Sequence, residues 1–145
     1  MKRRINILSL LIFMVFWNVS FGQKQLPYYN VDKEIKIKGT IQKIIIEPRY
    51  KNNSPFLIVI LEEKNTRQMF NVEISPVRFF SVDFHKGANL EVVGSIYSKE
   101  ERSQNIIARQ IRFRGEILVL RDKHGFPTWR GGGMMHKKKR KGKDF

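Results

Sequence analysis

Apolar and polar residues follow a period of two along most of the chain after residue 33. Glu34–Glu47 (EIKIKGTIQKIIIE) alternates isoleucine with lysine, threonine and glutamine, and Arg67–Ser75 alternates in the same way. Phe56–Leu61 is apolar on both faces, and Leu90–Ser98 and Ile106–Leu120 are rich in apolar residues. Alternation is typical of a strand with one buried face, and short apolar runs are typical of buried strands. The pattern therefore predicts five strands.

The segments between these strands carry turn-forming residues. Pro48–Pro55 (PRYKNNSP) has the composition of a loop, and Glu62–Asn65 and Lys99–Asn105 are polar turns. Between the third and fourth strands, Ser75 and Pro76 suit an N-cap followed by proline at the first helical position. We expect one or two helical turns there.

The predicted element order is three strands, a short helix and two further strands. This is the order of an all-β, five-stranded OB-fold-like barrel. Gly39 and Gly94 lie inside the first and fourth strands, where a glycine marks a bulge or a sharp bend. A bend suits the first strand, because it must pair in both halves of a small closed sheet. An SH3-like barrel would usually lack the helix, and a small sandwich would need more strands. We expect the barrel domain over residues 34–130.

The stretch LRDKHGFPTW, residues 120–129, has the composition of a chain reversal. Asp122 suits the start of a turn, and Gly125 suits a left-handed position. Pro127 prevents a fully hydrogen-bonded return strand, so the chain should run back as an edge segment whose Trp129 covers apolar surface. We interpret residues 120–130 as a closing clasp, with a ligand site as the alternative. The residues given a structural role are Gly39, Gly94, Arg121, Asp122, Gly125, Pro127 and Trp129.

The N-terminus has the three parts of a secretory signal peptide. Basic residues occupy positions 2–4, Ile5–Trp17 is almost entirely apolar, and the small residues Ser20 and Gly22 precede Gln23. The apolar run is short against the roughly 20 residues that span a bilayer, so we expect cleavage, with a retained anchor as the alternative. Residues 1–22 are then the signal peptide and 23–33 an N-terminal extension. We expect a protein exported to the periplasm or secreted.

Positive charge and the absence of cysteine narrow the possible functions. The chain has a net charge of +15 and no cysteine, which excludes disulfides, thiolate metal sites and lipoprotein attachment. After Gly131–Gly133, the last ten residues hold six bases and one acid, and we expect residues 131–145 to form a disordered tail. This balance favours anionic partners. The expected contacts in the tail are Lys137, Lys138, Lys139, Arg140, Lys141 and Lys143.

The predicted loops of the barrel also carry basic residues. OB-fold barrels bind ligands on the face of strands two and three, between the loops that join strands one to two and four to five. The candidate ligand-binding residues are Arg49, Tyr50, Lys51, Lys64, Arg67, Lys99 and Arg102. They indicate a module for an anionic cell-envelope polymer, lipid head groups or a membrane surface. Single-stranded nucleic acid is the alternative, because such binders combine basic grooves with aromatic rings.

Catalytic and metal motifs are weak. The sequence has no His-Glu-x-x-His, phosphate loop or nucleophile elbow. Ser81, Asp83 and His85 are close in sequence, but a triad must be assembled by the fold. The run Met134–His136 offers ligands that suit Cu(I), yet four cations follow it. We expect no enzyme, no cofactor and no metal site, and keep copper handling as a further alternative.

Several stretches resemble landmarks of a known family: GTIQKIII, LEVVGSIYS, NIIARQIRFRG and LVLRDKHGFPTWRGGG. They are similar to small exported bacterial OB-fold proteins related to the C-terminal domain of the magnetosome proteins MamS and MamX. The most specific piece matches an ending of the form LRD-x-x-G-x-P-x-W. The resemblance implies an OB-fold without an assigned activity. Ile74–Phe80 keeps the proline of the family pattern but departs around it, and the haem motifs found beside this domain in some relatives are absent.

Overall fold

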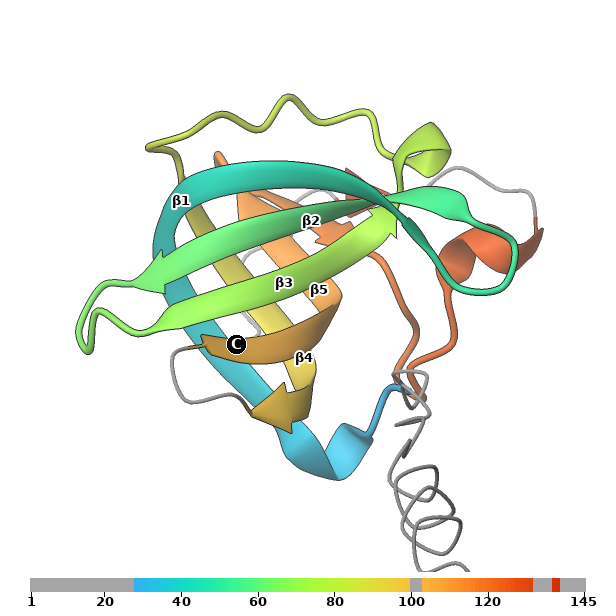
Figure 1. The fold of residues 1–145 in the computed structure, drawn as a ribbon, viewed down its shortest axis with the longest axis horizontal. Coiled ribbons are helices and arrows are strands. Elements are labelled where there is room, and N and C mark those ends of the chain that lie inside the picture. Colours follow the sequence, from blue (N-terminus) through green and yellow to red (C-terminus); the bar gives the residue numbers. More distant parts are fainter. Residues whose placement is uncertain (1–27, 100–102, 132–136, 139–145) are drawn as a thin grey trace, which may run out of the picture.

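The computed structural model describes residues 28–99, 103–131 and 137–138, and it is dominated by strands (Figure 1). The strands are β1 (Glu34–Arg49), β2 (Ser54–Glu63), β3 (Met69–Pro76), β4 (Asn89–Lys99), β5 (Ser103–Phe113), β6 (Glu116–Val119) and β7 (Lys137–Lys138). A 3-10 turn, η2 (Val31–Lys33), precedes β1, and two more, η3 (Val77–Phe79) and η4 (Thr128–Gly131), follow β3 and β6.

Five of the strands close into a barrel. β1 pairs with β2, β2 with β3 and β4 with β5, all antiparallel, and β1 also pairs with β4. The parallel pairing of β3 with β5 closes the ring. This arrangement confirms the predicted all-β, five-stranded OB-fold-like barrel.

β1 belongs to both halves of the barrel, as its length and its glycine predicted. Gly39 pairs with Glu63 of β2 on one side and with Leu90 of β4 on the other. A Cβ atom at Gly39 would overlap the Glu62 carbonyl oxygen and come within 2.8 Å of Leu61 Cγ. The glycine is therefore needed because two backbones approach closely there.

Gly94 has a related role in β4. The register between β4 and β5 shifts at Val93 and Gly94, and a Cβ at Gly94 would lie 2.5 Å from the Ile107 carbonyl oxygen. Both internal glycines lie where the barrel wall bends or closes. A larger residue would fit at neither position without movement of the backbone.

The inward faces of the strands supply the core. Its most deeply buried large residues are Ile41, Leu61, Ile74, Leu90, Ile106, Ile111 and Leu120. Full burial of such a side chain stabilises the fold by roughly 1.5–3 kcal/mol. Because the chain has no cysteine, this core takes the place of disulfides.

The predicted short helix between the third and fourth strands is present as one 3-10 turn, η3, which begins at Val77 and not at Pro76. Ser75 and Pro76 remain in β3, where they pair with Leu57 and Phe56, so Ser75 cannot act as an N-cap. Only η3 follows, and no side chain caps it. Strand pairing outweighs the local capping signal here, and residues 80–88 then run without regular structure to β4.

The predicted fifth strand is two strands of a hairpin. Arg114 and Gly115 both have positive φ, 49° and 83°, which is the geometry of a tight two-residue turn between β5 and β6. The predicted loop Pro48–Pro55 is likewise shorter than expected, because Pro48 and Pro55 pair with each other in the β1–β2 ladder.

Several predicted segments lie outside the described residues. They are the signal peptide, the first part of the N-terminal extension, and most of the basic tail. Lys137–Lys138 is the described part of the tail, and its backbone pairs with Ile117 and Leu118 of β6. In the ranges that the structure describes, no helix is long and apolar enough to cross a bilayer.

The clasp begins with the predicted turn. The Asp122 carboxylate accepts hydrogen bonds from the backbone N–H groups of His124 at 2.8 Å and Phe126 at 3.0 Å. Desolvation acts to raise the pKa of this carboxyl, but the two hydrogen bonds outweigh it and hold the pKa below its ordinary value. Gly125 has a φ of +89°, a conformation that a side chain would strain.

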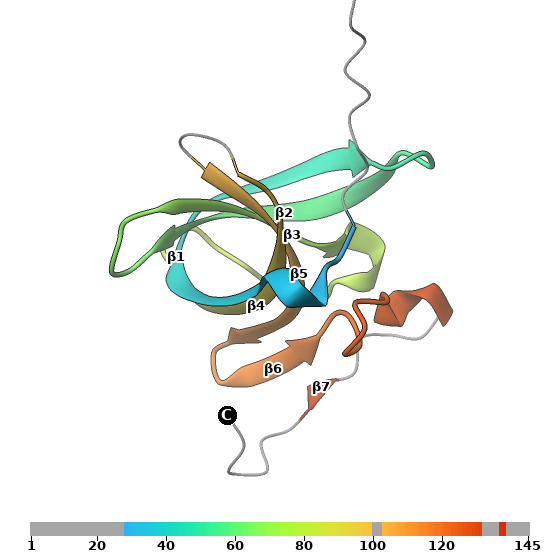
Figure 2. The ribbon, with the colours of Figure 1, turned by 90° about the horizontal axis from the view of Figure 1, so that it is seen from below.

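The return of the clasp is shorter than predicted. Arg121 and Pro127 form one antiparallel bridge, and the Thr128 N–H donates to the Leu120 carbonyl at 3.0 Å. The chain then winds into η4 and does not continue as an edge strand, and this turn buries Trp129 to 8% exposure. Figure 2 shows β6, the clasp and η4 together along one side of the barrel.

The close backbone approach at Gly39 gives a stability prediction. Gly39→Ala should lower the free energy of unfolding by about 1–3 kcal/mol, because the new methyl group overpacks the crossing of β1 and β2. Urea denaturation followed by circular dichroism measures this. The control is the neighbour Lys38→Ala, which loses only an exposed pair with Glu91 and should cost less than about 1 kcal/mol. Equal effects for the two variants would contradict the steric role of Gly39.

Candidate functional site

A cleft of about 780 Å³ lies where four segments of the chain meet. Its walls come from the N-terminal lead-in (Tyr28 and Tyr29), the β1–β2 turn (residues 50–54), the start of η3, and the clasp. Phe56, Ile107 and Arg121 also line it and are buried, so they form its base. Residues from both ends of the folded chain therefore share one site.

The cleft is basic. Its lining includes Lys51, Arg78, Arg121, His124 and Arg130, and none of the described residues that line it is acidic. Lys51, Arg78 and Arg130 are exposed, and none of them forms an ion pair with a described carboxylate. An anion in the cleft would therefore meet cations that are not already neutralised.

Aromatic rings line the cleft together with these cations. The lining rings are Tyr28, Tyr29, Tyr50, Phe56, Phe126 and Trp129. Two of them are open to solvent, since Tyr28 is 65% exposed and Phe126 is 62% exposed. Trp129 is buried and packs 6.5 Å, centroid to centroid, from the rings of Phe56 and Phe79. The cleft thus has a rigid aromatic base and exposed rings at its rim.

A buried carboxylate organises the base. Glu73 of β3 is 1% exposed, and it accepts a hydrogen bond from the Tyr50 hydroxyl. One of its oxygens lies 3.5 Å from Arg121 Nη2. Burial raises the pKa of the Glu73 carboxyl, although Tyr50 and Arg121 act in the opposite direction. Burial also raises the pKa of the Tyr50 hydroxyl, helped by the neighbouring Glu73 carboxylate.

Arg121 joins the clasp to the barrel wall. Its guanidinium donates to the backbone carbonyls of Ala108 on β5 and Ile74 on β3, the second at 3.4 Å. It also lies 5.0 Å from the centre of the Trp129 ring, within range of a cation–π interaction. Burial lowers the pKa of this guanidinium, and Glu73 opposes that shift. The residue assigned to the clasp from sequence is therefore a buried connector between three segments.

The N-terminal lead-in is held by its own contacts. The Tyr29 hydroxyl donates to the Glu34 carboxylate, which also receives a hydrogen bond from Arg109 Nη2 at 3.1 Å. Burial acts to raise the pKa of Glu34, but these two donors outweigh it and lower the pKa. A Cβ on Gly125 would collide with the Tyr29 ring, so the lead-in and the clasp are in direct contact.

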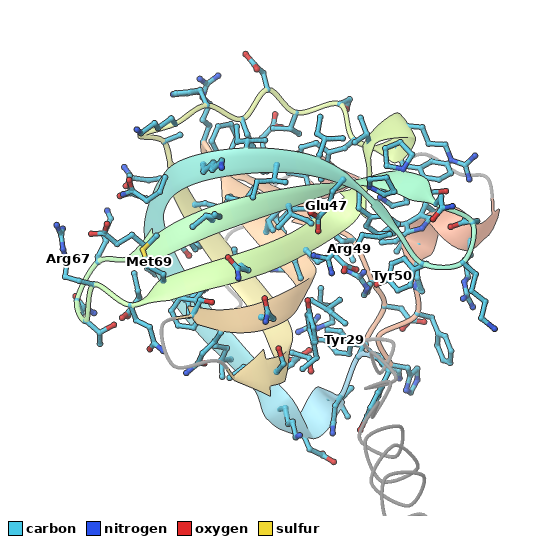
Figure 3. All side chains as sticks on the ribbon, viewed as in Figure 1. Tyr29, Glu47, Arg49, Tyr50, Arg67 and Met69 are labelled. Atoms are coloured by element: carbon cyan, nitrogen blue, oxygen red, sulfur yellow. The ribbon has the colours of Figure 1, made fainter. Side chains whose placement is uncertain are left out.

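The ligand-binding residues predicted from sequence do not form one site. Tyr50 and Lys51 line the cleft, whereas Arg49 points to Glu47 at 2.7 Å and to Glu73 at 3.9 Å. Figure 3 shows Arg49 and Tyr50 at one end of the sheet and Arg67 at the other end.

The other candidates lie away from the cleft. Lys64 and Arg67 belong to the β2–β3 turn, at the opposite end of β2 from residues 50–54, and Arg67 pairs with Glu62 at 2.8 Å. Lys99 ends β4 and Arg102 lies outside the described residues. Of the predicted residues, the cleft therefore brings together Tyr50 and Lys51, while Arg49 pairs with Glu47 and Glu73 and the β2–β3 turn lies at the far end of β2.

Sequence reasoning missed Tyr28, Arg78, His124, Phe126 and Arg130 as lining residues. The run from His124 to Arg130 combined charge with aromatic rings, and that signal was available in the sequence. We interpreted this run as a closing clasp, with a ligand site as the alternative, and in the structure the clasp both packs on the barrel and forms a wall of the cleft.

The candidates for chemistry stay apart. The described residues contain no group of three or more His, Asp or Glu side chains placed to hold a metal ion. Ser81, Asp83 and His85 are all exposed, in the segment between η3 and β4. Met134–His136, the proposed copper ligands, lie outside the described ranges.

No protein-family model matches this chain, and no curated protein matches it at a significant level. The resemblance to the MamS and MamX C-terminal domain therefore stays a prediction.

The Glu73–Arg121 pair gives a second stability prediction. Arg121→Met and Glu73→Leu should each lower the free energy of unfolding by about 3–5 kcal/mol, because each leaves a buried partner uncompensated. The double variant should cost clearly less than the sum of the two. Urea unfolding of all four proteins measures the coupling, and Arg67→Ala, in an exposed pair, should cost less than about 1 kcal/mol. Strict additivity would show that the two groups do not depend on each other.

Proposed function

We propose that this protein is an exported, non-enzymatic binding module whose cleft takes an anionic ligand of the cell envelope, a polymer or a lipid head group. The observation that carries the proposal is the lining of the cleft, which combines five basic residues with six aromatic residues and has no acidic residue among those described.

The ion pairs outside the cleft support the proposal that the anion binds in the cleft. Along the barrel, Lys38 and Arg112 both face Glu91, at 3.1 and 3.6 Å, and Arg109 faces Glu34. These basic residues are neutralised locally, so they attract an external anion weakly. The cations of the cleft rim are not, and their attraction for a polyanion should weaken as salt screens it.

Single-stranded nucleic acid is the second candidate. Tyr28 and Phe126 offer exposed rings beside Lys51 and Arg130, and bases stack on such rings whatever their sequence. Export favours an envelope ligand over nucleic acid, and export rests on the predicted signal peptide. A binding comparison between the two ligand classes separates them.

The basic tail is a separate contributor. Its six bases follow the clasp by a few residues and carry charge enough to bind a polyanion without the cleft. A variant with all six replaced by glutamine keeps the backbone of β7 and removes this contribution. The cleft proposal therefore has to hold in that variant.

The test reverses charge at the rim of the cleft. In the mature chain, residues 23–145, with the six tail bases replaced by glutamine, Lys51→Glu with Arg130→Glu should weaken binding of heparin, a soluble polyanion, by about tenfold or more. The slope of log affinity against log salt should fall as well, because fewer counterions are released. Fluorescence anisotropy with labelled heparin and with labelled single-stranded DNA, over a salt series, measures both quantities.

The matched control is Lys64→Glu with Arg67→Glu. It makes the same change in net charge at the distant β2–β3 turn, and it should alter affinity far less than the cleft variant. Equal losses in the two variants would show that net charge alone governs binding, and would sink the cleft proposal. Tighter binding of single-stranded DNA than of heparin, lost in the cleft variant, would favour the second candidate.

A further inference from the structure

The described surface has four exposed large apolar side chains: Tyr28, Val31, Ile46 and Phe126. Two of them, Tyr28 and Phe126, line the same cleft, although they are almost a hundred residues apart in sequence. Isolated exposed apolar residues are ordinary, but two on one rim expose rings that water solvates poorly. The placement of these two rings favours a partner that has an apolar layer.

The same rim carries the uncompensated cations. Lys51, Arg78 and Arg130 line the cleft together with the two rings, and all three are exposed. The Arg78 guanidinium carbon also lies 4.6 Å from the centre of the Phe79 ring, within range of a cation–π interaction. Aromatic rings beside basic groups are the composition of surfaces that lie at the boundary between lipid head groups and acyl chains.

Both ends of the folded chain lead to this rim. Tyr28 is the first described residue, Arg130 directly precedes Gly131, where the second described range ends, and both residues line the cleft. Beyond Arg130 the sequence adds the six bases of the tail, and before Tyr28 it has Lys24 as its last charge. The most basic segment of the sequence therefore begins seven positions after a lining residue of the cleft.

We propose that the rim of the cleft docks on an anionic lipid bilayer, with Tyr28 and Phe126 at the level of the head groups and the three cations against lipid phosphates. This proposal rests on the proposed function and names the ligand as a membrane surface. A soluble polymer would satisfy the cations but would leave the two rings in water. A bilayer satisfies both, and the tail adds further attraction to the same surface.

Trp129 provides a direct reporter of this geometry. The mature chain has lost Trp17 with the signal peptide, so Trp129, in the base of the cleft, is its one tryptophan. Brominated acyl chains quench tryptophan fluorescence at short range. Docking through the rim should therefore quench Trp129, whereas attachment through the tail alone should leave its emission nearly unchanged.

The experiment uses the mature chain, residues 23–145, and vesicles of phosphatidylcholine with or without phosphatidylglycerol. Co-sedimentation should show binding to the anionic vesicles only. Tyr28→Ser with Phe126→Ser should lower the partition coefficient by about tenfold or more, because two rings no longer leave water. The same variant should lose far less affinity for soluble heparin than for the vesicles, because heparin offers the two rings no apolar layer. Ile46→Ser, which removes an exposed apolar residue outside the cleft, should leave both affinities unchanged.

Three results would overturn the proposal: equal partition of the ring variant and the parent, equal losses with Ile46→Ser, or no quenching of Trp129 by brominated lipid at saturating vesicle. If heparin binding in those cases still depends on Lys51 and Arg130, the cleft remains a site for a soluble anion and the proposed function stands. If heparin binding is also insensitive to these residues, both proposals fail. Thermal unfolding of each variant checks that the exposed substitutions leave the fold intact.

Discussion

The buried pair of Glu73 and Arg121 is the interaction on which the site depends. Glu73 belongs to the barrel, Arg121 to the clasp and Tyr50, which donates to Glu73, to the β1–β2 turn. One carboxylate therefore positions two of the four cleft walls relative to the barrel. Separating the buried charges of Glu73 and Arg121 would cost several kcal/mol. The clasp therefore stays against the barrel, and Trp129 stays in the base of the cleft.

The location of free positive charge follows from how the strands are paired. Acidic residues are distributed along the strands so that Glu91 meets Lys38 and Arg112, Glu34 meets Arg109 and Glu62 meets Arg67. The cations of the cleft rim come from turns and from the clasp, where no described carboxylate lies opposite them. The cleft rim thus gathers basic residues that pair with no described carboxylate, and the same segments bring exposed rings to it.

Much of the fold was predictable because period-two alternation and turn residues are local signals. Gly39, Gly125 and the Asp122 turn were assigned correctly in position, and the barrel followed from the order of the elements. The errors share a cause. The cap at Ser75 and the treatment of Ile106–Leu120 as one strand interrupted at Gly115–Glu116 were inferred from neighbouring residues. In the structure, pairing with β2 keeps Ser75 extended, and the turn at Arg114 and Gly115 folds β6 back on β5.

By itself, the sequence determined the strands, the barrel class, the chain reversal at the clasp and the excess of positive charge, since each depends on residue type and short spacing. Only the tertiary structure decided which basic residues share a site. Arg49 and Lys51 are two positions apart, yet Arg49 forms ion pairs with Glu47 and Glu73, whereas Lys51 lines the cleft. Tyr28 and Phe126 meet because the barrel brings the lead-in and the clasp together, and no local pattern encodes a contact across so long a stretch of chain.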